Sequence, residues 1–286
     1  MNFWLLQIFN GVSFGMLLFL LAAGLSLIFG LLRIINMVHG VFYLWGGYIG
    51  YTVVLWTGSL TLALICSGVI VCAMGMVIEK FFIQRVYGDE FRQILLTFGL
   101  MLMLSEIAII VWGGASVTIP RPAILSFTIE LGTLTIPAYR VAIIIIGFMT
   151  ALLLWLLIDK TRIGAMIRAA VDNREIAQAT GIPVKVVFVG VFALGAGLAG
   201  LSGVIGGIVV GIYPGSDFEI LLLAFIVIVV GGIGSVAGAF VGSLFVGLID
   251  SFGKIFFPEF AMFTMFIPLV VVLVLKPTGL FGRELS

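Results

Sequence analysis

Apolar residues run almost unbroken through most of the chain, and polar residues are confined to a few short stretches. A helix that spans a membrane needs about 20 apolar residues, whereas a transmembrane β-strand alternates apolar and polar residues over about ten. Because the apolar runs are continuous, they predict helices. The predicted runs are Phe3–Leu32, Val41–Thr57, Leu60–Ile78, Ile94–Trp112, Tyr139–Ile158, Val186–Gly207, Ile220–Ile249 and Phe260–Leu275.

The seventh run, 220–249, is too long for a single span and is rich in glycine at its centre. It predicts either two short spans or a re-entrant pair of helices. We therefore expect an all-α polytopic membrane bundle of about eight spans, with broken or re-entrant glycine-rich segments. One transmembrane domain is expected over residues 1–286.

Composition narrows the class of protein further. Hydrophobic residues make up 63% of the chain and charged residues 9%, against about 45–50% and about 25% in soluble domains. This balance excludes a water-soluble enzyme and a disordered protein, and a net charge of +1 leaves no basic patch for a nucleic acid. Cys66 and Cys72 lie about 240° apart on one predicted helix, so no disulfide between them is expected.

Basic residues in short loops predict the orientation, because such loops stay in the cytoplasm. Counting spans back from these loops places the N-terminus outside, provided that the run 220–249 crosses twice. Residues 113–138 are then extracytoplasmic, and the alternation in SFTIELGTLTIP predicts a small β-hairpin, either a spacer or a docking surface. The basic residues in question are Lys80, Arg85, Arg92, Lys160, Arg162, Arg168, Arg174, Lys185, Lys276 and Arg283.

The segment 159–185 is the longest polar stretch and is predicted to be a cytoplasmic helix. Thr161 or Asp159 is suited to cap a helix that begins near Arg162, and Gly181 followed by Pro183 is suited to end it. A bend is possible at residues 172–173. The helix has a mixed charged and apolar surface, which fits docking in a groove of another protein or, alternatively, lying on lipid.

Arg33, Asn36 and His39 interrupt the otherwise apolar stretch 24–51. Such residues are costly in a membrane unless they face protein, water or a lumen. If Gly40 breaks the helix, freed backbone groups become available to a polar solute. The alternative is that Arg33 marks a cytoplasmic turn and that Asn36 caps the next span.

Small residues at four-residue spacing, such as Gly11 and Gly15, predict tightly packed spans. Glu106 lies inside the fourth predicted span and Asp250 at the end of the seventh, and for Glu106 a contact inside the bundle is favoured over a proton relay. The sequence GLSG at 200–203 is similar to the signature of rhomboid proteases, but His39, the one histidine, precedes it instead of following it. Since HExxH, CxxC and Walker A patterns are also missing, we expect no enzyme, no metal site and no nucleotide site.

Four blocks of the sequence together resemble the permease subunits of branched-chain amino acid ABC importers. These blocks are GLSLIFGLLRIINMVHGVFYLWGGYIGY, IGAMIRAAVDNREIAQATGI, VVGGIGSVAGAFVGSLFVGLID and LKPTGLFG. Their order and spacing match along essentially the whole chain, and the chain is most similar to the shorter of the two permease types in those systems. Urea and short-amide importers use similar permeases, so these substrates stay as alternatives, as does an ion-coupled secondary transporter.

The resemblance implies a multi-pass protein of the bacterial inner membrane that binds no cofactor itself, because a separate subunit uses the ATP. The implied partners are a paralogous permease in a heterodimer, two cytoplasmic ATPase subunits, an extracytoplasmic substrate-binding protein and membrane lipid, with no nucleic acid. The implied ATPase-coupling residues are Arg168, Asp172, Arg174, Glu175, Ala177 and Gly181. Asn36, His39 and Gly40 fall on the N-terminal signature and are assigned to the substrate path.

Overall fold

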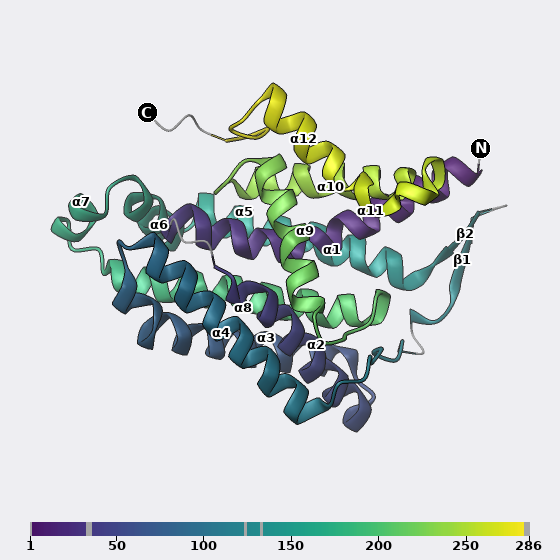
Figure 1. Ribbon diagram of the computed structural model, residues 1–286, viewed down its shortest axis with the longest axis horizontal. Coiled ribbons are helices and arrows are strands. Elements are labelled where there is room, and N and C mark those ends of the chain that lie inside the picture. The colour runs from purple at the N-terminus through teal and green to yellow at the C-terminus, as the bar shows by residue number, and fades with distance from the viewer. Residues whose placement is uncertain (1, 33–35, 123–124, 132–133, 283–286) are drawn as a thin grey trace.

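The computed structural model describes residues 2–32, 36–122, 125–131 and 134–282, and they form a bundle of helices with one small hairpin (Figure 1). The long helices are α1 (Asn2–Leu32), α2 (Val38–Thr57), α3 (Leu60–Phe81), α4 (Glu90–Trp112), α5 (Ala138–Lys160), α8 (Val184–Val209), α9 (Ser216–Gly231) and α10 (Val236–Phe256). The shorter ones are α6 (Arg162–Asp172), α7 (Arg174–Ala179), α11 (Ala261–Thr264) and α12 (Phe266–Leu275), with 3-10 turns at Ile83–Val86 and Pro258–Phe260.

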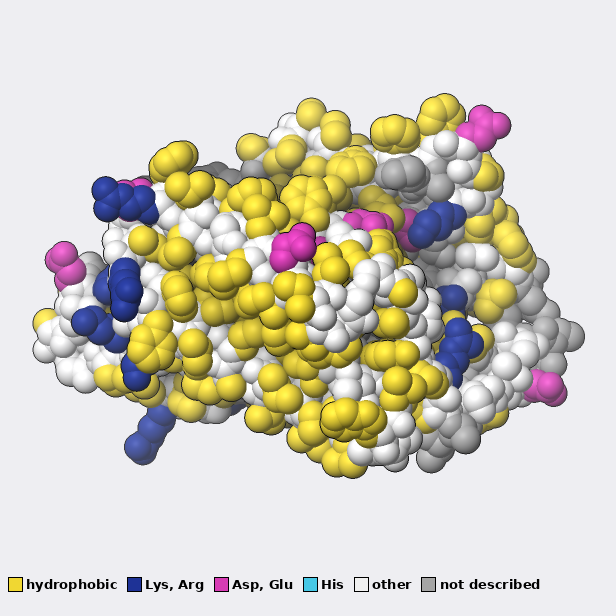
Figure 2. Space-filling view, turned by 60° about the horizontal axis from the view of Figure 1, so that its bottom comes forward, with side chains coloured by type: hydrophobic (Ala, Val, Ile, Leu, Met, Phe, Trp, Pro, Cys, Tyr) yellow, Lys and Arg dark blue, Asp and Glu magenta, His cyan; other side chains and the backbone are white. Residues whose placement is uncertain are grey.

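Six of the described helices are long and apolar enough to cross a membrane: α1, α3, α4, α5, α8 and α10. Together with α2, α9 and the α11–α12 pair, they are consistent with the predicted number of about eight spans. Figure 2 shows a broad belt of hydrophobic side chains, with Lys and Arg gathered at the two ends of the molecule. This distribution is that of a multi-pass membrane protein, whose charged ends meet water while its belt meets lipid.

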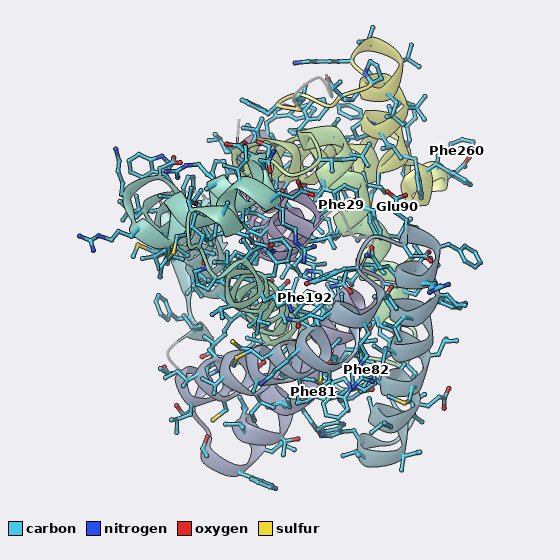
Figure 3. All side chains as sticks on the ribbon, turned by 90° about the vertical axis from the view of Figure 1, so that its left-hand side faces the viewer. Phe29, Phe81, Phe82, Glu90, Phe192 and Phe260 are labelled. Atoms are coloured by element: carbon cyan, nitrogen blue, oxygen red, sulfur yellow. The ribbon has the colours of Figure 1, made fainter. Side chains whose placement is uncertain are left out.

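Helix α1 forms the centre of the bundle. Its residues 15–28 are all buried, as expected for a helix that is apolar on every side. Phe192 of α8 is fully buried and meets Phe42 edge to face at 6.0 Å. Seen from the end that carries α6 and α7, Phe192 lies in the interior, whereas Phe81 and Phe82 lie near the periphery (Figure 3).

Backbones approach closely where glycines face each other. A Cβ atom added to Gly24 would lie 2.5 Å from the carbonyl oxygen of Gly195, and one added to Gly195 would lie 2.8 Å from that of Gly24. On α10, Ser243 and Gly247 meet Gly15 and Gly11 of α1 in the same way. These contacts confirm the tight packing predicted from the four-residue spacing of small residues.

The long apolar run 220–249 is divided between two helices, as predicted. Helix α9 ends at Gly231, and α10 begins at Val236 after a turn in which Gly232 and Gly234 have positive φ. Residues 280 and 281 pass beside this turn, where the N–H groups of Leu280 and Phe281 donate to the carbonyls of Val230 (2.9 Å) and Gly231 (2.8 Å). The last predicted span, 260–275, differs from the prediction because it is broken into α11 and α12.

The predicted hairpin is present as β1 (Thr128–Leu131) paired antiparallel with β2 (Leu134–Pro137), in a register that places Ile129 opposite Ile136. The hairpin and the N-terminal end of α1 lie at one end of the bundle, and α6 and α7 lie at the other (Figure 1). The two segments therefore lie at opposite ends of the bundle, and the assignment of the α6–α7 end to the cytoplasm stays a prediction. Cys66 and Cys72 are free, as expected, and the predictions made for Arg33 and Arg283 fall outside the described residues.

Candidate functional site

The predicted cytoplasmic helix is two helices that meet at Asn173. Thr161 caps α6, because its Oγ1 accepts a hydrogen bond from the N–H of Gly164 at 3.1 Å. Asn173 has extended backbone angles (φ −154°, ψ 107°) and its Oδ1 accepts from the N–H of Ile176 at 3.0 Å. An asparagine in this conformation ends one helix and caps the next, so the bend considered at residues 172–173 is a complete break.

Gly181 ends the second helix as predicted. Its φ of +86° lies in the left-handed region that side-chain-bearing residues rarely adopt. The N–H of Ile182 donates to the carbonyl of Ala177 at 3.0 Å, which closes the turn before Pro183 leads into α8. Gly181 therefore sets the angle between α7 and α8 and offers no side chain to a partner.

Helices α6 and α7 are packed on the bundle through a buried face. Ala177 is only 2% exposed, and it belongs to one apolar cluster with Ile167 and Ala170 of α6 and with Phe188 of α8. The opposite face is open, with Ile176 62% exposed and Ile163 also exposed. The segment is therefore held by its own protein through one face and presents the apolar side chains of Ile163 and Ile176 on the other, where they can meet a partner protein or lipid.

The four charged residues assigned to coupling divide into two pairs. Arg168 lies 3.7 Å from the carboxylate of Asp159 and donates to the carbonyl of Ile158, so it ties α6 back to α5. Arg174 places its guanidinium carbon 5.2 Å from the ring centre of Tyr87 and 5.3 Å from that of Phe188. Asp172 and Glu175 are exposed and have no hydrogen bond or ion pair within the described part of the chain, so these two carboxylates are available to another protein.

Arg174→Ala is expected to loosen α7 without unfolding the bundle. Each of the two cation–π contacts contributes about 0.5–1 kcal/mol at an exposed site, so the amides of α7 should exchange with solvent about 5- to 30-fold faster. Hydrogen exchange followed by mass spectrometry measures this directly. Arg162→Ala, at an exposed arginine without an aromatic partner, is the matched control, and equal exchange in the two variants would contradict the role given to Arg174.

A second polar group of residues lies deep in the bundle, where α2 begins. The side chains of Asn36 and His39 are fully buried, and His39 Nε2 lies 3.0 Å from the carbonyl oxygen of Leu21, near the middle of α1. Both side-chain polar atoms of Asn36 and the Nδ1 atom of His39 have no hydrogen-bond partner among the described residues. Unpaired buried polar groups are costly, so Asn36 and His39 are candidates for a role beyond packing.

Two sequence predictions fail at this position. Gly40 does not break a helix, because it lies in the first turn of α2, where a Cβ atom would lie 2.9 Å from the carbonyl carbon of Asp217. Asn36 does not cap α2, since Met37 occupies the N-cap and no side-chain capping bond forms. The need for glycine at position 40 is instead the close approach of the starts of α2 and α9.

Asp217, whose backbone lies against Gly40 at this junction, was not identified from the sequence. Its Oδ2 accepts a hydrogen bond from the hydroxyl of Ser105 on α4 at 2.5 Å. Two residues on, Glu219 Oε2 accepts from the hydroxyl of Tyr213, also at 2.5 Å. The signal in the sequence was the presence of two acidic residues, Asp217 and Glu219, between the turn at 214–215 and a long apolar run.

The hydrogen bond between Ser105 and Asp217 joins α4 to α9, and we call the surface of these two helices around it the α4–α9 face. Next to the two bonded residues in the sequence, Glu106 of α4 and Phe218 of α9 are exposed, as is Glu219. The expectation that Glu106 makes a contact inside the bundle is therefore wrong. Because carboxylates are unfavourable against lipid tails, this face is suited to meet protein or water.

The geometry gives no support to a protease. Ser202 Oγ donates to the carbonyl of Leu17 at 3.4 Å, whereas the His39 ring lies against the carbonyl of Leu21. Nucleophilic catalysis requires the serine and histidine to bond to each other. In the described part of the chain, there is also no group of three or more His, Cys, Asp or Glu side chains placed to hold a metal.

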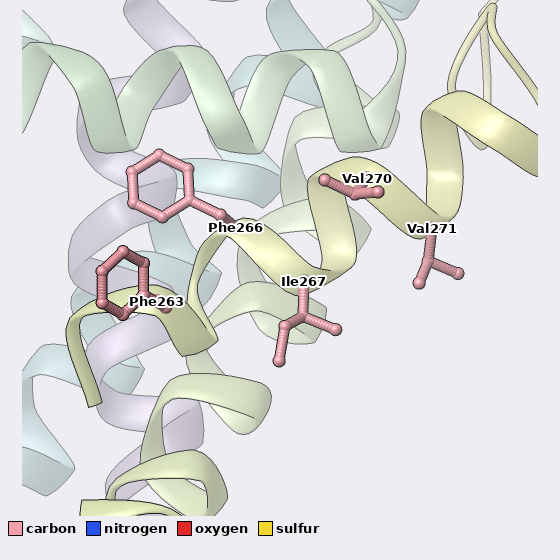
Figure 4. A pocket seen from close by; sticks show the side chains of 5 residues that line it. All are labelled: Phe263, Phe266, Ile267, Val270 and Val271. Atoms are coloured by element: carbon pink, nitrogen blue, oxygen red, sulfur yellow. The ribbon is translucent and has the colours of Figure 1, made fainter. Parts of the chain in front are cut away.

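A shallow hollow on α11 and α12 is entirely apolar (Figure 4). Its walls are Phe263, Phe266, Ile267, Val270 and Val271. Specific small-molecule sites combine apolar walls with a few polar groups that fix the orientation of the ligand. Without such groups, this hollow is a lipid-facing irregularity and not a candidate site.

Comparison with known proteins gives a consistent result over the whole chain. The model of a family described as "Branched-chain amino acid transport system / permease component" matches residues 7–275. The high-affinity branched-chain amino acid transport system permease protein LivH of Escherichia coli is 29% identical, over 98% of this chain and 96% of that protein. The corresponding protein BraD of Pseudomonas aeruginosa is 26% identical over the same shares. No solved structure matches.

Proposed function

Because this chain belongs to the family of branched-chain amino acid transport permeases, we propose that it is the transmembrane permease subunit of an ATP-driven importer in the bacterial inner membrane. It carries branched-chain, hydrophobic amino acids that a soluble extracytoplasmic binding protein delivers. The family match over nearly the full length is the observation that carries this proposal. A urea or short-amide permease and an ion-coupled secondary transporter are the alternatives.

Coupling to two cytoplasmic ATPase subunits takes place through α6 and α7. The open carboxylates of Asp172 and Glu175, together with exposed Ile163 and Ile176, supply the charged and apolar contacts that a docking helix needs. Arg168 and Arg174 bind within the chain, and Ala177 packs against α8. The two acidic residues therefore contact the ATPase. The two arginines, Ala177 and Gly181 hold α6 and α7 rigidly on the bundle, so that a movement of the ATPase is passed on to the spans.

The translocation path runs along the α4–α9 face, between this subunit and a paralogous permease. Exposed Glu106 and Glu219 suit the ammonium group of an amino acid, and exposed Phe218 and Leu222 suit its aliphatic side chain. Behind this face, at the junction of α2 and α9, lie Asn36, His39 and Gly40. Their effect on the path is indirect and is passed on by Asp217. Rigid helices with two stable packings would convert ATPase closure into opening of the path.

Uptake by the reconstituted complex tests the function. The chain, its partner permease and two ATPase subunits are placed in liposomes, with the binding protein outside and ATP inside. Radiolabelled leucine should accumulate without any ion gradient, and an ionophore should have no effect. Accumulation that needs a gradient and ignores ATP would identify a secondary transporter, and competition by urea or acetamide but not by isoleucine would change the substrate class.

The Ser105–Asp217 hydrogen bond is expected to stabilise the junction of α4 and α9. Removing Ser105 leaves the buried carboxylate of Asp217 unpaired, and removing Asp217 leaves the half-buried hydroxyl of Ser105 unpaired, a cost of about 1–3 kcal/mol. Ser105→Ala and Asp217→Ala should each lower the free energy of unfolding by that amount, and the double variant should lose less than the sum of the two. Unfolding in SDS measures the free energy of unfolding of the unmodified chain, the two single variants and the double variant. If the two single losses simply add up in the double variant, the hydrogen bond contributes nothing.

A further inference from the structure

A cavity of about 420 Å³ lies between α1, α5, α8 and α10, apart from both α6–α7 and the α4–α9 face. Gln7 lies near the start of α1 and Arg140 lies in the first turn of α5, just after the hairpin, so the cavity belongs to the extracytoplasmic half of the bundle. Its volume falls in the range of about 300–1,000 Å³ that is usual for small-molecule sites. Phe14, Leu17 and Ile143 supply apolar walls.

The polar residues of the cavity are held in place by bonds to one another. Arg140 Nη1 donates to Asn10 Oδ1 at 2.6 Å, and Ser251 Oγ donates to Gln7 Oε1 at 3.0 Å. Lys254 Nζ forms an ion pair with Asp250 Oδ2 at 2.7 Å. Side chains fixed in this way are already oriented for a ligand, which lowers the entropy that binding must overcome.

The bonds leave one acceptor and several donors unused. The side chain of Asp250 is 4% exposed, yet its Oδ1 has no hydrogen-bond partner among the described residues. A guanidinium has five N–H donors, and the bonds of Arg140 to Asn10 and to the Tyr139 hydroxyl use only Nη1 and Nε. The cavity thus combines a buried carboxylate oxygen that lacks a donor with an arginine that can still bind an anion.

We propose that this cavity binds a small zwitterion, whose primary ammonium group donates to Asp250 Oδ1 and whose anionic group is held by Arg140. A carboxylate matches the two-pronged geometry of a guanidinium, and the apolar walls accept an aliphatic side chain. The same chemistry occurs in a free α-amino acid and in the headgroup of an ethanolamine lipid. Since the site lies within a single subunit, the proposal does not depend on coupling to an ATPase or on the route of transport.

Binding of radiolabelled leucine to the purified full-length chain tests the proposal. The chain is placed in nanodiscs made of phosphatidylcholine and phosphatidylglycerol, which contain no primary ammonium. Leucine should bind saturably, and 4-methylpentanoate and 3-methylbutylamine, which lack the ammonium and the carboxylate respectively, should bind about tenfold or more weakly. Asp250→Asn should abolish the preference for leucine over 4-methylpentanoate, and Arg140→Met should abolish the preference over 3-methylbutylamine.

Matched variants separate the site from general damage to the fold. Glu130→Gln on the exposed hairpin and Lys185→Met at the opposite end remove the same charges outside the cavity and should bind like the unmodified chain. Asp250→Glu keeps the carboxylate and should recover most of the affinity that Asp250→Asn loses. Size-exclusion chromatography of each variant reports folding independently of binding.

A parallel measurement identifies the source of the zwitterion. If phosphatidylethanolamine added to the nanodiscs displaces leucine, and native mass spectrometry finds this lipid on the unmodified chain but not on Asp250→Asn, the lipid headgroup is the occupant. Leucine binding that the lipid leaves unchanged identifies the free amino acid. Binding of neither compound, or equal binding by Asp250→Asn, would overturn the proposal even if the complex transports leucine normally.

Discussion

Glu175→Lys is expected to abolish ATP-driven uptake, by more than about 100-fold, while the chain remains inserted and folded. Glu175 is exposed on α7 and is not bonded to any described residue of its own chain, so the substitution removes nothing that holds the bundle together. Reversing a charge that meets an opposite charge on a partner costs several kcal/mol, and each 1.4 kcal/mol changes an equilibrium constant tenfold. Leucine uptake by the reconstituted complex measures the effect.

Glu130→Lys is the control for this variant, because it makes the same change of charge on the exposed hairpin at the opposite end of the bundle. Its uptake should stay within about twofold of the unmodified complex. Pull-down of the ATPase subunits separates lost docking from lost transmission. Normal uptake by Glu175→Lys would remove α7 from the coupling path. Arg168→Glu is a poorer test, since Arg168 also bonds to Asp159 and Ile158.

Gly24→Val is expected to destabilise the bundle by about 3 kcal/mol or more, because overpacking costs about 1–3 kcal/mol even where side chains can move aside. At this position, the obstacle is the backbone of Gly195, 2.5 Å from an added Cβ atom, and α1 and α8 would have to separate. The fraction of chain that survives mild heating in detergent as a monodisperse peak measures the loss. Gly195→Val should behave in the same way from the other helix.

Gly99→Val provides the matched control. Gly99 lies in the middle of α4, and a Cβ atom there would meet nothing within 4 Å. The variant should retain the stability of the unmodified chain, since the added side chain enters open space and displaces no neighbouring atom. If Gly24→Val and Gly99→Val were equally stable, the close α1–α8 contact would not contribute to the fold.

Local signals in the sequence were sufficient to predict where α6 begins, where α7 ends and where the hairpin lies. Thr161 caps α6 and Gly181 ends α7 because capping depends on a few consecutive residues. The hairpin at 128–137 was predicted for the same reason, because alternation within a short stretch sets its register. The resemblance of four blocks to a permease family was also sufficient for the family, which the match over residues 7–275 confirms.

Contacts between distant segments could not be predicted in this way. Glycine is needed at position 40 because the backbone of Asp217, 177 residues later, lies against it. The exposure of Glu106 depends on which side of α4 the rest of the bundle covers. The burial of Ala177 likewise depends on α8. Periodicity can show that a helix has an apolar face. In a chain that is 63% hydrophobic, almost every face of a helix is apolar, so periodicity does not determine which helices pack against each other.

The strand-like passage of residues 280 and 281 beside the end of α9 has a consequence for biosynthesis. The carbonyls of Val230 and Gly231 accept hydrogen bonds from the N–H groups of Leu280 and Phe281, which leave the ribosome well after α9 has been made. Until then, the C-terminal end of α9 is held by fewer hydrogen bonds than in the finished protein. Closure of this end of the bundle therefore waits until residues 280 and 281 have been made, and a nascent chain stalled before them would leave this end of α9 open to quality-control proteases.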